Sequence, residues 1–286
     1  MKRLSPFVTL SALVVTFLAF APASLAQTFT SIDYPGAAQT RANSINAAGD
    51  IVGTYETATG VQHGFLLSKG GTYTSIDYPG AIRTNANGIA YNGKIVGSWR
   101  GTNNRQHGFI LYKGNFTALD YPGSFGTSAR SITPSGDIVG TYVDALGVTR
   151  GFLYSRGDFS TIEVPGSPQT EPKSINAAGD IVGFYDDASD DRHGFLLSDG
   201  EFTTIDVPGA VRTEAWSINS SGAIAGFYTD SVGITHGFTL IKGAFATIDY
   251  PGTTSTVVRE INNSSKKMVG IYKDGANKDH GFLLSN

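Results

Sequence analysis

The 286-residue chain contains no cysteine. This absence excludes disulfide bonds, thiolate metal sites, thiol catalysis and a lipid-modified N-terminal cysteine, so stability has to come from side-chain packing. Charge is scarce and balanced, with 21 Lys and Arg against 24 Asp and Glu and no long run of either sign. A protein that follows a phosphate backbone needs a basic patch, so nucleic acid is not an expected partner.

Long apolar runs are missing as well, except near the N-terminus. Residues 10–20 are apolar, follow two basic residues and precede small residues at Ser24 and Ala26. This arrangement is typical of a signal peptide, and the run is shorter than the ~20 residues needed to span a bilayer. We therefore expect residues 1–26 to be a signal peptide. Residues 27–286 should form a single exported domain, extracellular or periplasmic, monomeric and without membrane insertion.

A sustained apolar period of 3.6 residues, which would indicate amphipathic helices, is also absent after the N-terminal run. The chain has instead six copies of a repeat of about forty-three residues. The element Ile-Asp-Tyr-Pro-Gly begins, with some substitutions, at Ile32, Ile76, Leu119, Ile162, Ile205 and Ile248. The element His-Gly-Phe begins at His63, His107, Arg150, His193, His236 and His280. The element Ser-Ile-Asn-x-x-Gly-Asp-Ile-Val-Gly begins at Ser44, Gly88, Ser131, Ser174, Ser217 and Glu260.

Each copy has the pattern of four short strands joined by turns rich in Gly and Asn. In the first copy we expect strands at residues 44–46, 50–55 and 64–67, and residues 29–33 represent the fourth strand. Six repeats of four strands predict an all-β fold, a six-bladed β-propeller with one blade per repeat. Two trefoils of three repeats each are the alternative architecture.

The order of the elements predicts how the propeller closes. The repeats start with a fourth strand at residues 29–33 and end with a third strand at residues 281–284, so only the N-terminus can complete the last blade. Across four of the third-to-fourth hairpins, a basic residue precedes an acidic one by thirteen residues: His107 and Asp120, Arg150 and Glu163, His193 and Asp206, His236 and Asp249. His280 has no such partner after it, and Asp33 occupies the homologous position, so we predict a pair across the closure.

We interpret these pairs as structural. Metal binding by the histidines is the alternative, but third-strand residues of neighbouring blades should lie far too distant from one another to share an ion. Ca²⁺ is the one cofactor that the sequence leaves open, because Asp187, Ser189 and Asp191 stand in an acidic loop. That loop lacks the Gly and the distal Glu of an EF-hand, so a solvated hairpin tip is the competing interpretation.

The residues Gly-Asp-Ile-Val-Gly at 49–53, followed by His-Gly-Phe-Leu-Leu at 63–67, resemble the bacterial extracellular HAF repeat family. The resemblance covers nearly all of residues 27–286. The family pattern usually has Ala between His and Phe, whereas every copy here has Gly, so the chain resembles a variant of that pattern. The resemblance implies export and a β-propeller-like repeat fold. It implies no established activity and no catalytic residues.

The position just before the expected inner strand varies between repeats. Its residues are Asn43, Asn87, Arg130, Lys173, Trp216 and Arg259. Two positions earlier stand Arg41, Asn85, Ser128, Glu171, Glu214 and Val257. In a propeller these side chains should converge near the mouth of the axial channel. We expect a site for an anionic or sugar-like ligand there, with Trp216 as a stacking platform; a hydrated mouth whose residues drift is the alternative.

Three classes of function follow from these observations. The favoured one is non-enzymatic binding or a structural role, with a carbohydrate or anionic ligand at the channel mouth. A scaffold that binds other proteins through variable loops is the second. The third is a carbohydrate-active hydrolase or lyase that uses Glu171 and Glu214 as an acid and base pair. No other catalytic motif accompanies these two carboxylates.

Overall fold

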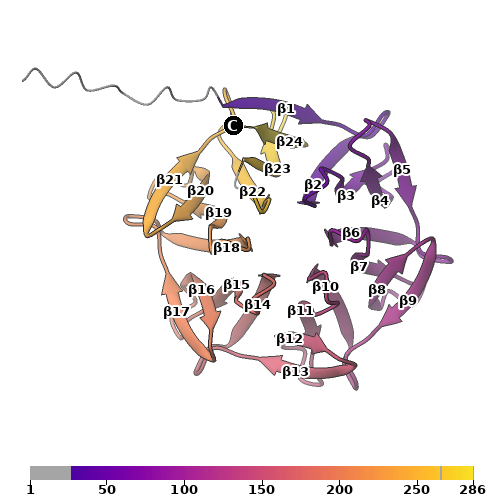
Figure 1. The fold of residues 1–286 in the computed structure, drawn as a ribbon, viewed down its shortest axis with the longest axis horizontal. Helices are drawn as coiled ribbons and strands as arrows, with labels where there is room; N and C mark the ends of the chain where they lie inside the picture. Colours follow the sequence, from indigo (N-terminus) through magenta and orange to yellow (C-terminus); the bar gives the residue numbers. More distant parts are fainter. Residues whose placement is uncertain (1–26, 265, 286) are drawn as a thin grey trace, which may run out of the picture.

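The computed structural model describes residues 27–264 and 266–285, and the predicted signal peptide lies outside them. The described residues form six four-stranded antiparallel sheets placed around one axis (Figure 1). The protein is therefore a six-bladed β-propeller, and the predicted fold is confirmed; two trefoils are not formed. Because the described part of the chain consists of strands and turns, it holds no helix long and apolar enough to cross a membrane.

Within each blade, we count the strands from the axis outwards. The inner strands are β2 (Gln39–Ile45), β6 (Arg83–Ile89), β10 (Gly126–Ile132), β14 (Gln169–Ile175), β18 (Arg212–Ile218) and β22 (Thr256–Ile261). The second strands are β3 (Ile51–Glu56), β7 (Ile95–Arg100), β11 (Ile138–Val143), β15 (Ile181–Asp186), β19 (Ile224–Thr229) and β23 (Lys267–Lys273). The third strands are β4 (Gln62–Leu67), β8 (Gln106–Tyr112), β12 (Thr149–Ser155), β16 (Arg192–Ser198), β20 (Thr235–Ile241) and β24 (Asp279–Ser285). The outer strands are β5 (Tyr73–Ile76), β9 (Asn115–Leu119), β13 (Asp158–Ile162), β17 (Glu201–Ile205), β21 (Ala244–Ile248) and β1 (Thr28–Ile32).

The last blade is completed by the N-terminal strand, as predicted. β1 runs antiparallel to β24, from the pair Thr28 and Ser285 to the pair Ile32 and Gly281. The two ends of the described chain therefore lie side by side in one sheet (Figure 1). This arrangement satisfies the backbone groups of β24 that an open ring would leave exposed.

The inner strands differ from the sequence-based expectation. β2 begins at Gln39, whereas the sequence pattern placed the start of this strand at Ser44. The pairing of β2 with β3 shifts by one residue between Ala42 and Ser44, and every other inner strand has the same shift. Such a β-bulge breaks the alternation of inward and outward side chains. The strand is therefore hard to recognise from its hydrophobic pattern.

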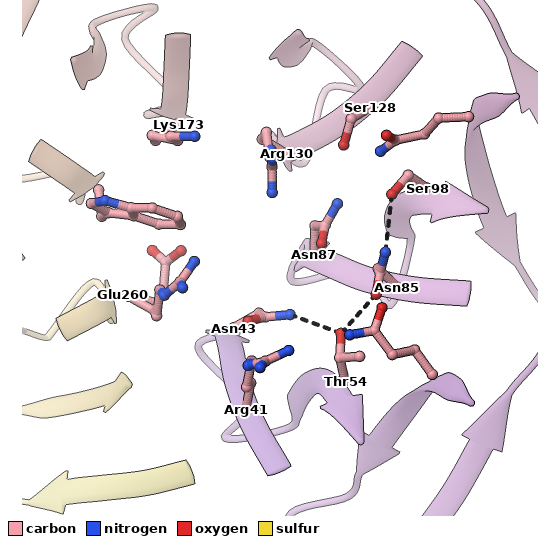
Figure 2. A pocket seen from close by; sticks show the side chains of 14 residues that line it. Arg41, Asn43, Thr54, Asn85, Asn87, Ser98, Ser128, Arg130, Lys173 and Glu260 are labelled. Atoms are coloured by element: carbon pink, nitrogen blue, oxygen red, sulfur yellow. Dashed lines mark hydrogen bonds between the residues drawn. The ribbon is translucent and has the colours of Figure 1, made fainter. Parts of the chain in front are cut away.

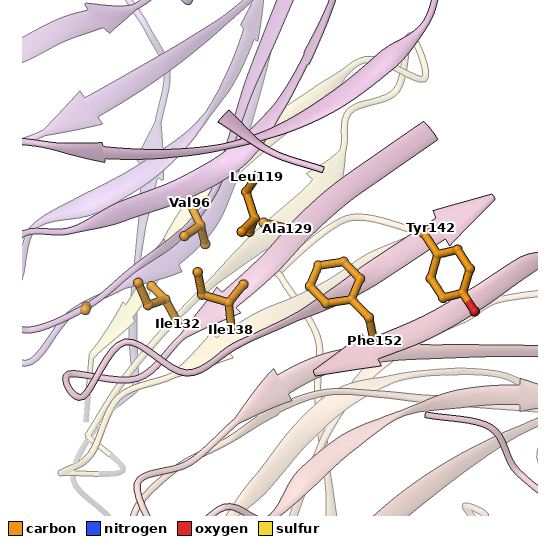
Figure 3. Close-up of a cluster of buried hydrophobic side chains, with 8 residues drawn as sticks. Val96, Leu119, Ala129, Ile132, Ile138, Tyr142 and Phe152 are labelled. Atoms are coloured by element: carbon orange, nitrogen blue, oxygen red, sulfur yellow. The ribbon is translucent and has the colours of Figure 1, made fainter. Parts of the chain in front are cut away.

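Apolar side chains fill the space between neighbouring blades. One phenylalanine per blade is almost completely buried: Phe65, Phe109, Phe152, Phe195, Phe238 and Phe282. In one cluster, Phe152 and Ile138 of one blade pack with Val96 and Leu119 of the preceding blade (Figure 3). Each fully buried side chain of this size contributes roughly 1.5–3 kcal/mol, so stacked blades form a core without disulfides.

Steric crowding explains why the second glycine of Gly-Asp-Ile-Val-Gly recurs in every blade. Gly53 pairs with Phe65, and a Cβ on Gly53 would overlap both the carbonyl oxygen of Arg41 and the Phe65 ring. The equivalent glycines of the other blades are in the same position: Gly97, Gly140, Gly183, Gly226 and Gly270. Close packing of the buried ring against the bulged inner strand therefore requires glycine here.

Candidate functional site

The six bulges place one side chain per blade on the axial channel. The extra residue at each register shift is Asn43, Asn87, Arg130, Lys173, Trp216 or Arg259. All six line one cavity of about 260 Å³, and Figure 2 shows the labelled ones turned towards its centre. The structure thus brings the six candidate ligand-binding residues together. They lie within the inner strands, and a bulge, which re-aims a side chain, explains why they face the axis.

One side of the cavity carries amides and hydroxyl groups. Asn43 Nδ2 donates to the carbonyl oxygen of Ala86 at 2.9 Å, and Asn87 Nδ2 donates to that of Ala129 at 2.8 Å. Each of these two amides therefore links its own blade to the next one. Asn85 and Ser98 add further polar groups to this wall (Figure 2).

The other side carries cations around Trp216. The guanidinium carbon of Arg259 lies 3.7 Å from the centroid of the Trp216 ring, and Lys173 Nζ lies 4.7 Å from it. Trp216 Nε1 donates to Glu214 Oε2 at 2.9 Å, which fixes the orientation of the indole. An aromatic face attracts cations electrostatically. The ring that was expected to stack on a ligand therefore already holds two cationic side chains in place.

Glu171 and Glu214 do not line this cavity, and both are engaged in ion pairs. Lys173 Nζ lies 2.6 Å from Glu171 Oε2, and Arg192 Nη1 lies 3.1 Å from Glu214 Oε1, which Arg212 also contacts. Burial alone would raise the pKa of Glu171, but the charge and hydrogen bond of Lys173 lower it below the usual value. A general acid needs the opposite shift. The surroundings of Glu171 thus keep it ionised and make it a poor proton donor.

Arg130 and Arg259 are the cavity cations without an ion-pair partner. Neither forms an ion pair with any carboxylate that the structure describes, and the buried Nε of each has no hydrogen-bond partner. Burial lowers the pKa of both, and the charge of Arg130 lowers that of Arg259 further, to about 9. A guanidinium with this pKa is still protonated at neutral pH. The two positive charges therefore repel each other in the cavity.

Glu260 is a site residue that sequence reasoning did not recognise. It occupies the position that holds Ser or Gly in the other five repeats, which was a usable signal. Ser217 Oγ donates to Glu260 Oε1 at 2.7 Å, and burial raises the pKa of Glu260 to about 8. The carboxyl is therefore mostly protonated at neutral pH. It lines the main cavity and also a second one of about 110 Å³ formed by the turns that follow the inner strands.

The basic and acidic partners predicted across the third-to-fourth hairpins and across the closure lie within hydrogen-bond distance of each other. Arg150 Nη1 is 2.6 Å from Glu163. The Nδ1 distances are 2.8 Å for His107 and Asp120, 3.0 Å for His193 and Asp206, 3.0 Å for His236 and Asp249, and 2.8 Å for His280 and Asp33. A further pair, His63 and Asp77 at 2.6 Å, was missed because one additional residue in its hairpin changes the spacing.

These outer residues and the acidic loop do not converge on an ion site. Asp187 Oδ1 accepts hydrogen bonds from the backbone N–H groups of Ser189 at 2.8 Å and Asp191 at 2.9 Å. This is the geometry of a side chain that stabilises its own turn. Across residues 27–264 and 266–285, no group of three or more His, Cys, Asp or Glu is placed to hold a metal.

Comparison with known proteins supports the fold. No family model matches the chain, and no curated protein sequence matches it. The Aleuria aurantia lectin in complex with Fucalpha1-6GlcNAc has 10% sequence identity and a TM-score of 0.55, over 86% of this chain and 91% of the lectin. The SapL1 lectin in complex with alpha methyl fucoside has 11% identity and a TM-score of 0.59, over 87% and 92%. A gluconolactonase from Xanthomonas campestris has 12% identity and a TM-score of 0.53, over 87% of each chain. One fold therefore serves both binding proteins and an enzyme, and the function has to be argued from the site.

Proposed function

We propose that the protein is an exported, non-enzymatic propeller that binds a carbohydrate in its axial cavity. The observation that carries the proposal is the cavity wall, because each of the 14 side chains that line it has a polar or charged group. Small-molecule sites are mostly apolar, so this wall does not suit an apolar ligand. Saccharide hydroxyl groups both donate and accept hydrogen bonds, and a dense set of amides, hydroxyls and cations matches them.

Two further observations support this proposal. Two of the similar solved structures are lectins in complex with fucose-containing sugars, so the fold accommodates saccharide binding elsewhere. The carboxylates of Glu171 and Glu214 are engaged in ion pairs, which favours binding over hydrolysis. Export through a signal peptide at residues 1–26 and membership of the HAF repeat proteins are proposed from the sequence alone.

The test is calorimetric titration of purified residues 27–286 with a panel of neutral and acidic oligosaccharides. We expect at least one saccharide to bind. Replacing Trp216 with alanine should weaken that binding about tenfold or more, because the ring positions the cations of Arg259 and Lys173. The matched control is Trp99→Tyr, since Trp99 does not line the main cavity and other blades have Tyr there. If the folded protein bound no saccharide, the proposal would be wrong, and protein partners would be sought next.

A further inference from the structure

Four cationic side chains line the axial cavity, and two of them are neutralised within the protein. Arg41 Nε lies 2.5 Å from Asp279 Oδ2, and Lys173 Nζ lies 2.6 Å from Glu171 Oε2. The remaining two cations, Arg130 and Arg259, form no ion pair within the described part of the chain. The cavity therefore carries two positive charges in excess.

The same region has buried polar atoms that lack hydrogen-bond partners. They are Nε of Arg130, Nε of Arg259 and Oγ of Ser128, and all three residues line the cavity. A buried donor without a partner costs free energy comparable to a lost hydrogen bond, so such groups are rare in native proteins. Water could accept these hydrogen bonds, but water would not neutralise the repulsion between two guanidinium groups. An anion would do both.

The carboxylates that attract Arg130 and Arg259, namely Glu171, Glu214 and Asp279, are each already paired with another cation. Glu260, the carboxyl that itself lines the cavity, does not supply a counter-charge either. Its carboxyl accepts a hydrogen bond from Ser217 at 2.7 Å, and burial raises its pKa to about 8. At neutral pH the group is therefore mostly uncharged. The excess positive charge remains available to a ligand.

We propose that the cavity recognises the carboxylate of an acidic saccharide, bound by Arg130 and Arg259, with the hydroxyl groups of the sugar facing Asn85 and Ser98. This inference rests on the proposed carbohydrate-binding function and names the ligand class. A guanidinium presents parallel N–H groups that match a carboxylate. The Arg259 guanidinium is stacked on Trp216 at 3.7 Å, so its plane is set before the ligand arrives.

The size of the cavity limits how much of the ligand can bind inside it. Its volume of about 260 Å³ lies below the ~300–1,000 Å³ typical of small-molecule sites. One terminal uronate residue, rather than a folded oligosaccharide, is therefore the part of the ligand that enters. The rest of a longer chain extends out of the cavity.

The experiment compares two ligands that differ in a single group: methyl glucuronide and methyl glucoside, titrated into residues 27–286 at neutral pH. We expect the glucuronide to bind at least about tenfold more tightly, with an affinity that falls as salt is added. Arg130→Gln and Arg259→Gln should each remove about tenfold or more of the glucuronide affinity and lower the glucoside affinity by much less. Lys69→Gln, which removes an exposed charge outside the cavity, is the control.

Other results separate the two proposals. Equal binding of glucuronide and glucoside would overturn the preference for acidic sugars and leave the carbohydrate-binding function standing. Acetate or sulfate binding as tightly as the glucuronide would identify a simple anion site and overturn both. Binding of none of these probes overturns both as well, provided that thermal melts show a folded protein.

Discussion

Glu260 shows how one residue changes the channel without changing the fold. The serine at the equivalent position of neighbouring repeats links blades: Ser217 Oγ accepts a hydrogen bond from the backbone N–H of Ile261 at 3.1 Å. A glutamate in the same place keeps the blade intact but adds a carboxyl group in a buried setting. Burial disfavours the ionised form of a carboxyl. The residue therefore links stability to pH.

We predict that Glu260→Gln removes part of the pH dependence of stability. The folded pKa of Glu260 is raised to about 8, from an ordinary value of 4.5. The contribution of Glu260 to the free energy of unfolding is fully present below its ordinary pKa of 4.5 and is lost as pH rises through the folded pKa. The reason is that, between the two pKa values, the native state retains a proton that the unfolded chain has released. The melting temperatures of the wild type and of Glu260→Gln should be measured from about pH 4 to about pH 9. At high pH the variant should melt at the same temperature as the wild type or above it. Parallel curves would contradict this assignment.

A second residue-level prediction concerns the repeated glycine of the second strand. A Cβ at Gly140 would overlap the carbonyl oxygen of Ser128 and lie 2.9 Å from a carbon of the Phe152 ring. Overpacking of this kind costs roughly 1–3 kcal/mol, so Gly140→Ala should lower Tm by several degrees. Gly275→Ala is the matched control, because a Cβ there meets no atom within 4 Å. Thermal denaturation of the two variants checks the difference; equal melting temperatures would show that the strands can shift to make room.

Among the elements, the third-to-fourth hairpins carry the histidine and carboxylate pairs. Three of these histidines also face a carboxylate of the loop between the second and third strands: His236 Nε2 lies 3.4 Å from Asp230, His280 Nε2 lies 3.3 Å from Asp274, and His193 Nε2 lies 3.7 Å from Asp187. The imidazole also stacks on an aromatic side chain of the second strand: the ring centroids of His280 and Tyr272 lie 5.1 Å apart. These contacts tie the loop between second and third strands to the outer strand. The contacts raise the pKa values of His236 and His280, so the hairpins of these two residues are expected to respond to mild acid.

We predict that the pair of His236 and Asp249 stabilises the protein most at low pH. Burial opposes protonation of His236, but hydrogen bonds and charges from Asp249 and Asp230 raise its pKa above the ordinary 6.5. The stabilisation is therefore complete below that value and disappears as pH rises through the folded pKa. Asp249→Asn should lower Tm more at about pH 5.5 than at about pH 8.5.

The double variant with His236→Asn provides the control for this prediction. If the two residues act through each other, Asp249→Asn should cost little once His236 is absent. An Asp249→Asn effect that is the same at both pH values would show that the carboxylate acts by some route other than the imidazolium.

The bulged inner strands explain where sequence reasoning succeeded and where it did not. The hairpins of the second, third and outer strands follow local turn signals and a repeated spacing, so they could be predicted. The inner strands could not be delimited, because the bulge at residues such as Asn43 interrupts the period of two on which strand prediction depends. The same bulge places the variable residues on the channel.

The ring as a whole depends on the strand that closes it. β1 pairs with β24, and its Ile32 is 4% exposed in the core. Phe29 packs edge-on against Tyr250 at 5.1 Å and Phe282 at 5.6 Å, so β1 joins the last blade through side chains as well as backbone. Arg41 of the first blade contacts Asp279 of the last, which adds a polar contact across the same junction.

We predict that deleting residues 27–34 strongly lowers the melting temperature. The deletion removes β1, exposes the edge of β24 and takes away the carboxylate of Asp33. Burial of Ile32 alone contributes roughly 1.5–3 kcal/mol, and each kcal/mol corresponds to about 2–4 °C in a domain of this size. A loss of more than about 5 °C is therefore expected by differential scanning calorimetry. Asp33→Asn, which keeps the strand, should cost much less; an unchanged melt of the deletion would mean that β1 does not close the ring.

The amino-acid sequence by itself determined the number of blades, the four-strand content of each blade and the closure by the N-terminal strand. These properties follow from spacing and from the order of repeated elements, which are visible along one chain. Only the tertiary structure decided the state of the channel: Arg130 and Arg259 have no ion-pair partner, Trp216 is stacked on a cation, and Glu260 is mostly neutral. Side chains from six blades, far apart in sequence, meet at the axis, and their protonation and pairing depend on burial and on neighbours that no local pattern records.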